Sequence, residues 1–126
     1  MIIGIDFDGT CVKHRFPDIG EDIGAVPVLQ NLVKNGHKLI LITMRCKDSD
    51  MGDTLTPALK WFQLNDIPLY AVNDNPTQHS WTSSRKIFCH VYIDDQFLGC
   101  PIKTDDEHAY VDWKNAETLL KKIGAL

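Results

Sequence analysis

Short apolar runs alternate along the chain with stretches in which apolar residues recur at helical spacing. The apolar runs predict β-strands at residues 1–6, 37–43, 67–72 and 87–93. The helical spacing predicts α-helices at residues 23–35, 51–66 and 113–123. Strands that alternate with helices favour right-handed crossovers and a mostly parallel sheet.

The predicted fold is an α/β three-layer sandwich. We expect a Rossmann-like, mostly parallel sheet of about five strands with helices on both faces. The run Leu39-Ile40-Leu41-Ile42 is apolar without a break, which is typical of a strand covered on both sides. We expect the fifth strand between residues 99 and 111. At 126 residues the chain fits one domain, residues 1–126.

The composition narrows the class of protein. Hydrophobic residues make up 44% and charged residues 24%, as in ordinary soluble domains, and the formal net charge is −4. This acidic balance argues against chain-wide binding to nucleic acid or an anionic membrane. It does not exclude binding through a local basic patch. Asp6 and Asp8 interrupt the N-terminal apolar run, which argues against a signal peptide, and no stretch has the length of a membrane span. Scattered cysteines without a C-x-x-C pair favour reduced thiols and a cytoplasmic location.

Polar side chains gather where the predicted strands end. Asp6 and Asp8 close the first strand, Thr43 closes the second, and Asp94 and Asp95 close the fourth. Ligands of open α/β sheets bind beyond the carboxyl ends of the strands. Residues i and i+2 of a strand point the same way, so the first two carboxylates project together. Four carboxylates at one edge require a cation, and Mg²⁺, which binds through a few carboxylates plus substrate phosphate, suits them best.

Neighbouring residues have the chemistry of a phosphate-binding cradle. Thr43 offers a hydroxyl and a backbone N–H, and Lys86 offers a point charge. Gly9 and Thr10 form a turn whose N–H groups can face an anion. Arg45 is either a solvated loop residue or a bidentate contact to substrate phosphate. With a metal ion on one side and these donors on the other, a phosphoryl group would lie in line with a carboxylate nucleophile.

In four motifs the sequence resembles the haloacid dehalogenase-like (HAD) superfamily of phosphohydrolases. The D-x-D-x-T motif matches Asp6-Phe7-Asp8-Gly9-Thr10, and the hydrophobic strand that ends in threonine matches residues 39–43. The motif lysine is best matched by Lys86, with its neighbour Arg85 as the alternative, and the acidic pair by Asp94-Asp95. The four motifs occur in order between residues 2 and 95.

The resemblance implies a Mg²⁺-dependent phosphatase that acts through an aspartyl-phosphate. Asp6 would attack phosphorus, and Asp8 would protonate the leaving oxygen and then deprotonate water. Thr43 and Lys86 would hold the phosphoryl oxygens. The expected metal ligands are Asp6, Asp8, Asp94 and Asp95, the last as a direct ligand or a support. The presence of Asp8 favours phosphate chemistry over dehalogenation.

Many members of this superfamily carry a cap domain, for which the chain leaves no room. Residues 9–24 suffice for a flap, and residues 73–85 form a polar loop that we expect to face the substrate. In this loop, Trp81 and His79 are either a substrate platform or a packing contact.

Capless relatives tend to act on macromolecular ends or to use a neighbouring subunit as a lid. The expected substrate is therefore a phosphorylated macromolecule, including a nucleic-acid end, or a small sugar or nucleotide phosphate handled by a homo-oligomer. A catalytically silent phosphate-binding or regulatory module on the same fold is the alternative function.

Overall fold

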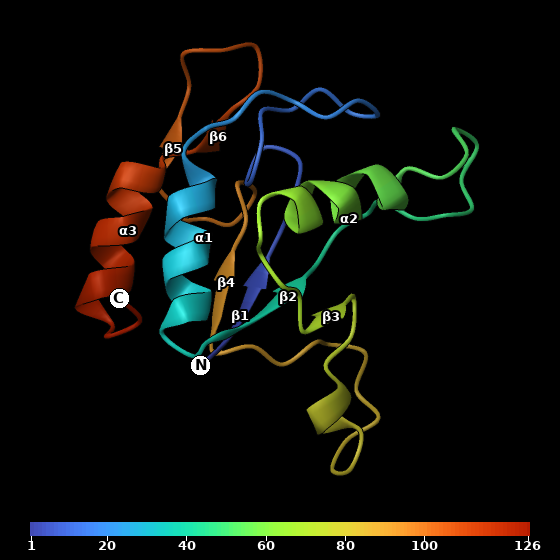
Figure 1. The fold of residues 1–126 in the computed structure, drawn as a ribbon, viewed down its shortest axis with the longest axis vertical. Helices are drawn as coiled ribbons and strands as arrows, with labels where there is room; N and C mark the ends of the chain where they lie inside the picture. Colours follow the sequence, from blue (N-terminus) through green and yellow to red (C-terminus); the bar gives the residue numbers. More distant parts are fainter.

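A four-stranded parallel sheet forms the centre of the molecule. The computed structural model describes residues 1–126, and its sheet consists of β1 (Ile2–Ile5), β2 (Lys38–Leu41), β3 (Ala71–Val72) and β4 (Val91–Ile93). The strands lie in the order β3-β2-β1-β4 (Figure 1). All four predicted strands are present, each shorter than its predicted range, and every pairing is parallel as expected.

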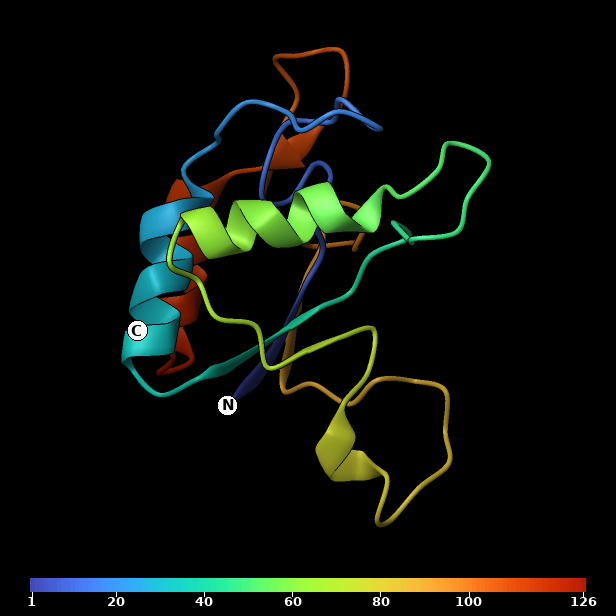
Figure 2. The same cartoon turned by 45° about the vertical axis from the view of Figure 1, so that its right-hand side comes forward.

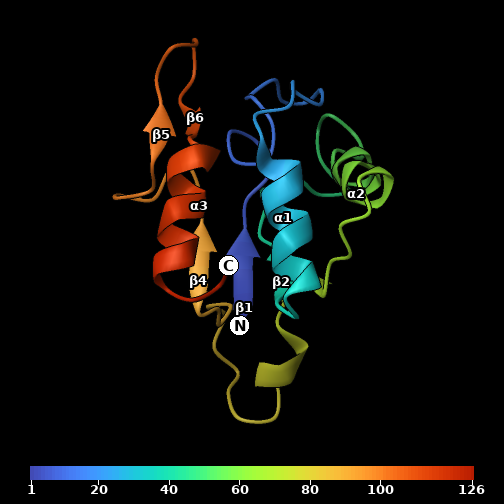
Figure 3. The same cartoon turned by 60° about the vertical axis from the view of Figure 1, so that its left-hand side comes forward.

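Three helices pack on this sheet and confirm the three predicted helices. They are α1 (Ala25–Lys34), α2 (Leu55–Leu64) and α3 (Trp113–Lys122), and α1 lies between the other two (Figure 3). None of them combines the length and the apolar character that a helix needs to cross a membrane.

All three helices pack on the same face of the sheet. Each contributes side chains to one buried cluster that also contains Ile3 and Ile5 of β1. These two residues lie in register with Leu39 and Leu41 of β2, which belong to the same cluster. Residues in register across parallel strands point to the same face. Helices on both faces, as expected from the sequence, are therefore not confirmed.

The opposite face of the sheet is covered by the segment that joins β3 to β4. This segment contains only a short 3-10 helix, η1 (Pro76–Gln78) (Figure 2). Gly4 lies on this face, where a Cβ atom would come within 2.9 Å of the Cys89 Sγ. The Tyr92 hydroxyl lies on the same face and donates to the Ile87 carbonyl at 2.5 Å. A loop thus makes a crossover that is usually an α-helix.

Two buried amide side chains, 1% and 4% exposed, anchor this segment: Asn75 and Gln78. The Gln78 Nε2 donates to the carbonyls of Ser84 at 3.2 Å and Lys86 at 3.0 Å, and its Oε1 accepts from the Phe88 N–H at 2.8 Å. The Asn75 Nδ2 donates to the Phe88 carbonyl at 2.9 Å. Neutral side chains therefore hold the backbone on which Lys86 sits.

The expected fifth strand is not part of the main sheet. β5 (Ile102–Lys103) pairs with β6 (Tyr110–Val111) in a separate antiparallel hairpin. This hairpin lies beside the loop at residues 9–24 (Figure 1), and the Val111 N–H donates to the Gly9 carbonyl at 2.9 Å. The main sheet has four strands because β5 and β6 pair with each other and not with the main sheet.

Candidate functional site

Three carboxylates converge where two neighbouring strands end. Asp6 directly follows β1, and Asp94 and Asp95 directly follow β4, which pairs with β1. One oxygen of each can be chosen so that the three atoms lie within 4.8 Å of one another. All three side chains are half-buried. Three of the four predicted metal ligands are thus brought together.

Burial and mutual repulsion disfavour the ionised form of these groups. Burial, followed by the charges of Asp94 and Asp95, raises the pKa of Asp6 from 3.8 to about 8. Burial also raises the pKa of Asp94, and the neighbouring Asp95 adds to this effect. A cation among the oxygens would reverse the balance, because opposite charge favours the ionised form.

The Thr10 hydroxyl links two of the carboxylates. Its oxygen lies 2.9 Å from Asp6 Oδ2 and 3.1 Å from Asp95 Oδ1, within donating distance of both. The same oxygen accepts a hydrogen bond from the Asp95 N–H at 3.1 Å. Thr10 is fully buried, and its carbonyl accepts from the Trp113 indole N–H at 2.7 Å. Thr10 therefore positions the carboxylates and is itself held by the start of α3.

At the magnesium site expected from the sequence, Thr10→Val should weaken Mg²⁺ binding by about 10-fold, since groups that orient metal ligands typically account for 10- to 100-fold in affinity. Valine keeps the shape of threonine and removes only the hydroxyl. Calorimetric titration with Mg²⁺ measures the change. Thr118→Val, at an exposed position of α3, is the matched control and should leave the affinity unaltered. Equal affinities of Thr10→Val and the unmodified protein would contradict the orienting role.

The turn at Gly9 and Thr10 does not form the predicted anion-binding cradle. The Gly9 N–H donates to the Val12 carbonyl at 2.8 Å, and the Thr10 N–H donates to the Phe7 carbonyl at 3.1 Å. Gly9 has a φ of +81°, and a Cβ there would come within 2.7 Å of Asp95 Oδ2. Glycine is required because the backbone passes so close to a carboxylate. This turn supports the acidic cluster and leaves no N–H free for phosphate.

Asp8 does not join the acidic cluster, because Arg45 holds both of its oxygens. The Arg45 Nε donates to Asp8 Oδ2 at 2.7 Å, and Nη2 donates to Oδ1 at 2.8 Å. The remaining N–H groups donate to the carbonyls of Pro17, Asp18 and Thr54. Arg45 is only 1% exposed. The interpretation of Arg45 as a solvated loop residue is therefore wrong, and its N–H groups are engaged within the chain. The prediction of the Asp8 carboxylate as a metal ligand stays a prediction, since Asp8 lies outside the group formed by Asp6, Asp94 and Asp95.

The flap at residues 9–24 lies against the β5–β6 hairpin. The Lys13 Nζ and the Arg15 Nη2 lie 3.2 and 3.0 Å from Asp106 Oδ2, and the Arg15 Nε lies 3.4 Å from a Glu21 oxygen. Hydrogen bonds from the Glu107 N–H and from these cations lower the pKa of Asp106. The flap's cations are thus paired within the chain.

Thr43 keeps one donor for a ligand. Its N–H donates to Asn73 Oδ1 at 2.9 Å, and its Oγ1 accepts from the Arg45 N–H at 3.1 Å. The hydroxyl hydrogen takes part in neither bond. Of the two Thr43 groups predicted to bind phosphate, the side chain is available and the backbone N–H is occupied.

Arg85 and Lys86 both line a hollow of about 310 Å³ that also borders Asp6 and Asp94. Neither residue forms an ion pair with a carboxylate. The Lys86 Nζ lies 6.0 Å from the centre of the Tyr92 ring. Both candidates for the motif lysine are therefore unpaired cations on the wall of the same hollow.

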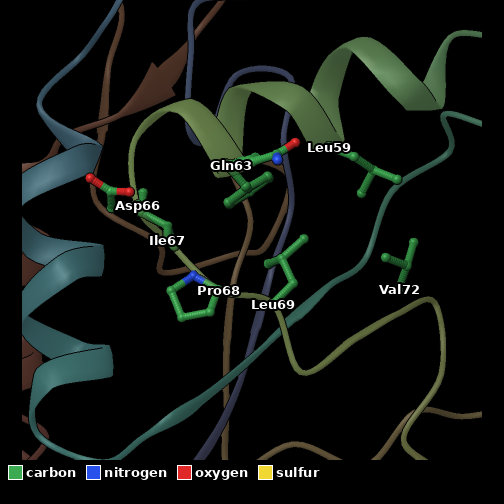
Figure 4. A pocket seen from close by; sticks show the side chains of 8 residues that line it. Leu59, Gln63, Asp66, Ile67, Pro68, Leu69 and Val72 are labelled. Atoms are coloured by element: carbon green, nitrogen blue, oxygen red, sulfur yellow. The ribbon is translucent and has the colours of Figure 1, made fainter.

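A smaller hollow of about 230 Å³ opens over the same edge of the sheet. Its lining contains predicted site residues and four others: Asp6, Asp8, Thr43, Arg45, Asp95, His14, Phe16, Met44 and Gln96. Asp6 borders both the hollow lined by Arg85 and Lys86 and the hollow lined by Asp8. A further hollow of about 480 Å³ between α2 and the segment leading to β3 has a mostly apolar lining and contains none of the predicted site residues (Figure 4).

Trp81 and His79 line neither of the two hollows at Asp6. The Trp81 ring packs edge-on against Phe88 at 6.2 Å, and the His79 Nε2 lies 2.7 Å from Asp74 Oδ1. These contacts favour the packing interpretation over a substrate platform.

Comparison with known proteins gives one informative likeness. No family model matches the chain, and no curated protein matches it. A solved structure of a conserved protein from Bacteroides thetaiotaomicron is 34% identical, with 98% of this chain and 91% of that chain covered and a TM-score of 0.75. The chain belongs to the same family as this Bacteroides protein. Because the relative is described only as a conserved protein, the likeness identifies the family and leaves the activity to be inferred from the site.

Three residues that were not among the predicted site residues lie beside them in this family member. His14 and Gln96 line the smaller hollow beside Asp6. Asn73, with a φ of +49°, holds Thr43 by accepting from its N–H and donating to its carbonyl. Asn73 was predicted to begin a loop at a strand end, and the tolerance of asparagine for positive φ was the available signal.

Proposed function

We propose that the protein is a Mg²⁺-dependent phosphomonoesterase of the HAD type that acts through an aspartyl-phosphate on Asp6. The observation that carries the proposal is the carboxylate of Asp6, which lies among the oxygens of Asp94 and Asp95 and borders a hollow with two unpaired cations. A nucleophile for phosphorus needs both a metal that neutralises it and cations that hold the phosphoryl oxygens.

The donor set fits Mg²⁺. Asp6, Asp94 and Asp95 provide only hard oxygen ligands, and their half-buried position leaves room for water and a phosphate oxygen. The raised pKa of Asp6 indicates that a cation is needed to keep this carboxylate ionised at neutral pH. When bound, Mg²⁺ neutralises charge on the nucleophile and on the phosphoryl group.

The chain's own residues carry out two successive displacements. An oxygen of Asp6 attacks phosphorus, the ester P–O bond breaks, and the leaving oxygen takes a proton from Asp8. Asp8 then removes a proton from a water molecule, the water oxygen attacks phosphorus, and the bond to Asp6 breaks. Inorganic phosphate leaves, and both carboxyl groups return to their initial state.

The phosphoryl oxygens are held by side chains in this scheme. The free hydroxyl of Thr43 donates one hydrogen bond, and Lys86 supplies a positive charge, with Arg85 as the alternative. The backbone contributes no donor at Gly9 or Thr10. Binding of the phosphoryl group therefore depends on the loop that carries Arg85 and Lys86.

The site's openness limits the substrate to two classes. A hollow of about 230 Å³ with no cap accepts the end of a phosphorylated macromolecule, or a small sugar or nucleotide phosphate closed in by a second subunit. Pairing of Lys13 and Arg15 with Asp106 reduces the positive charge available to a nucleic-acid end. We propose a cytoplasmic location, because all four cysteines are free thiols.

Phosphate release by the 126-residue chain tests the proposal. The assay compares excess Mg²⁺ with EDTA over 4-nitrophenyl phosphate, sugar phosphates, nucleotides, phosphopeptides and phosphorylated oligonucleotides. We expect Mg²⁺-dependent release from at least one of them. Phosphate binding without release from any substrate would instead support the silent phosphate-binding module.

A further inference from the structure

We infer that Arg45 is a positioning residue that fixes the carboxylate of Asp8 for proton transfer and locks the flap to it. The inference rests on the proposed function, in which Asp8 moves protons. It goes beyond that function by assigning a task to a residue that contacts no substrate.

The contacts of Arg45 use its whole guanidinium group. An arginine has five N–H donors, and Arg45 makes five hydrogen bonds between 2.7 and 3.1 Å. Two go to the two oxygens of Asp8, and three go to the carbonyls of Pro17, Asp18 and Thr54. A single side chain thus joins Asp8 in the turn after β1, the flap and the residue that precedes α2.

The surroundings allow this group only one arrangement. The guanidinium carbon lies 5.1 Å from the ring centres of both Phe7 and Phe16, and the side chain is 1% exposed. A buried charge is tolerated only when it is fully paired and hydrogen-bonded. Any rotation of Arg45 would leave at least one donor unpaired away from water. Asp8 is therefore held in one orientation.

Asp8 remains accessible for chemistry. Its side chain is 13% exposed and borders the hollow that also contains Asp6 and Thr43. Each carboxylate oxygen accepts one hydrogen bond from Arg45 and has a second lone-pair site. Arg45 thus sets the direction of Asp8 without occupying all of its proton-accepting capacity.

Lysine cannot reproduce these contacts, because it has one donor nitrogen in place of a planar fork. Arg45→Lys keeps the positive charge and therefore tests the geometry. We expect about 100-fold lower kcat/KM on an alkyl phosphomonoester, whose leaving oxygen needs a proton. We expect less than about 5-fold loss on 2,4-dinitrophenyl phosphate, whose leaving group departs as an anion. The kcat/KM values report the step in which the leaving group departs, before water enters.

Arg15→Lys is the matched control, because Arg15 is an arginine of the flap itself and pairs with Asp106 and Glu21. It should leave both kcat/KM values unchanged. If Arg45→Lys does not fold, Phe16→Ala takes its place, since Phe16 is 41% exposed and covers one side of the guanidinium. We expect about 10-fold selective loss on the alkyl substrate for this variant.

Three results would overturn the inference. Equal losses on the two substrates would mean that Arg45 serves only stability. A loss confined to KM would mean that it contacts substrate after all. Absence of turnover by the unmodified protein would refute the proposed function and the inference together, whereas an active parent with unselective variants would refute the inference alone.

Discussion

Asp6→Asn is expected to lower Mg²⁺-dependent phosphate release by about 10³-fold or more, since an amide cannot replace the carboxylate as the nucleophile of a covalent step. The same substitution should raise the melting temperature of the metal-free protein. The amide is neutral without a bound proton, whereas the buried Asp6, with a pKa raised to about 8, must take up a proton or hold a disfavoured charge when the metal-free chain folds at neutral pH. Opposite changes in activity and stability would exclude unfolding as the cause of the lost activity.

Phosphate release and thermal unfolding, measured on the same preparation, check this result. Asp48→Asn is the matched control, because Asp48 is an exposed residue of the loop that follows Thr43 and forms no ion pair. It should leave both quantities as they are. Retention of more than about a tenth of the activity by Asp6→Asn would show that another group attacks phosphorus.

The stability of the metal-free protein should fall as the pH rises from about 4 to about 8. The pKa of Asp6 is about 8 in the folded chain against 3.8 for an unperturbed aspartate, so across this range the folded state binds more protons than the unfolded state. The stabilisation that protonation of Asp6 contributes is fully present below about pH 4 and is lost as the pH rises through about 8. The raised pKa of Asp94 acts in the same direction. We expect a decrease on the order of 2 to 4 kcal/mol in the free energy of unfolding.

Mg²⁺ should cancel most of this decrease, because a ligand that binds only the folded state stabilises it. Urea unfolding at about pH 5 and about pH 8, in EDTA and in excess Mg²⁺, measures the four values. Asp6→Asn should show a weaker dependence on both pH and Mg²⁺. A metal-free protein that is more stable at the higher pH would refute the electrostatic account of the acidic cluster.

The acidic cluster could be predicted from the sequence because it depends on local periodicity. Asp6, Asp94 and Asp95 directly follow strands, and parallel strands place such residues at one edge whatever the details of packing. The order of strands and helices along the chain could likewise be predicted, because apolar runs alternate with stretches of helical spacing. The same patterns do not say which face a crossover covers, so the single-sided arrangement of the helices was not foreseen.

Arg45 could not be interpreted from the sequence because all its side-chain partners are distant along the chain. Its pairing depends on Asp8 and on three carbonyl groups, and a carbonyl group is common to every residue. The occupied N–H groups of Gly9 and Thr10 were missed for a similar reason, since only the three-dimensional turn determines which carbonyl each one meets.

The loop that carries Arg85 and Lys86 is anchored by the neutral amides of Asn75 and Gln78. Hydrogen bonds between uncharged groups respond little to salt, whereas salt at 0.1 M screens exposed charges over a distance of about 10 Å. Raising the ionic strength should therefore leave the loop in place and weaken only the attraction between its cations and a phosphate. The salt dependence of KM becomes a direct measure of how many cations touch the substrate.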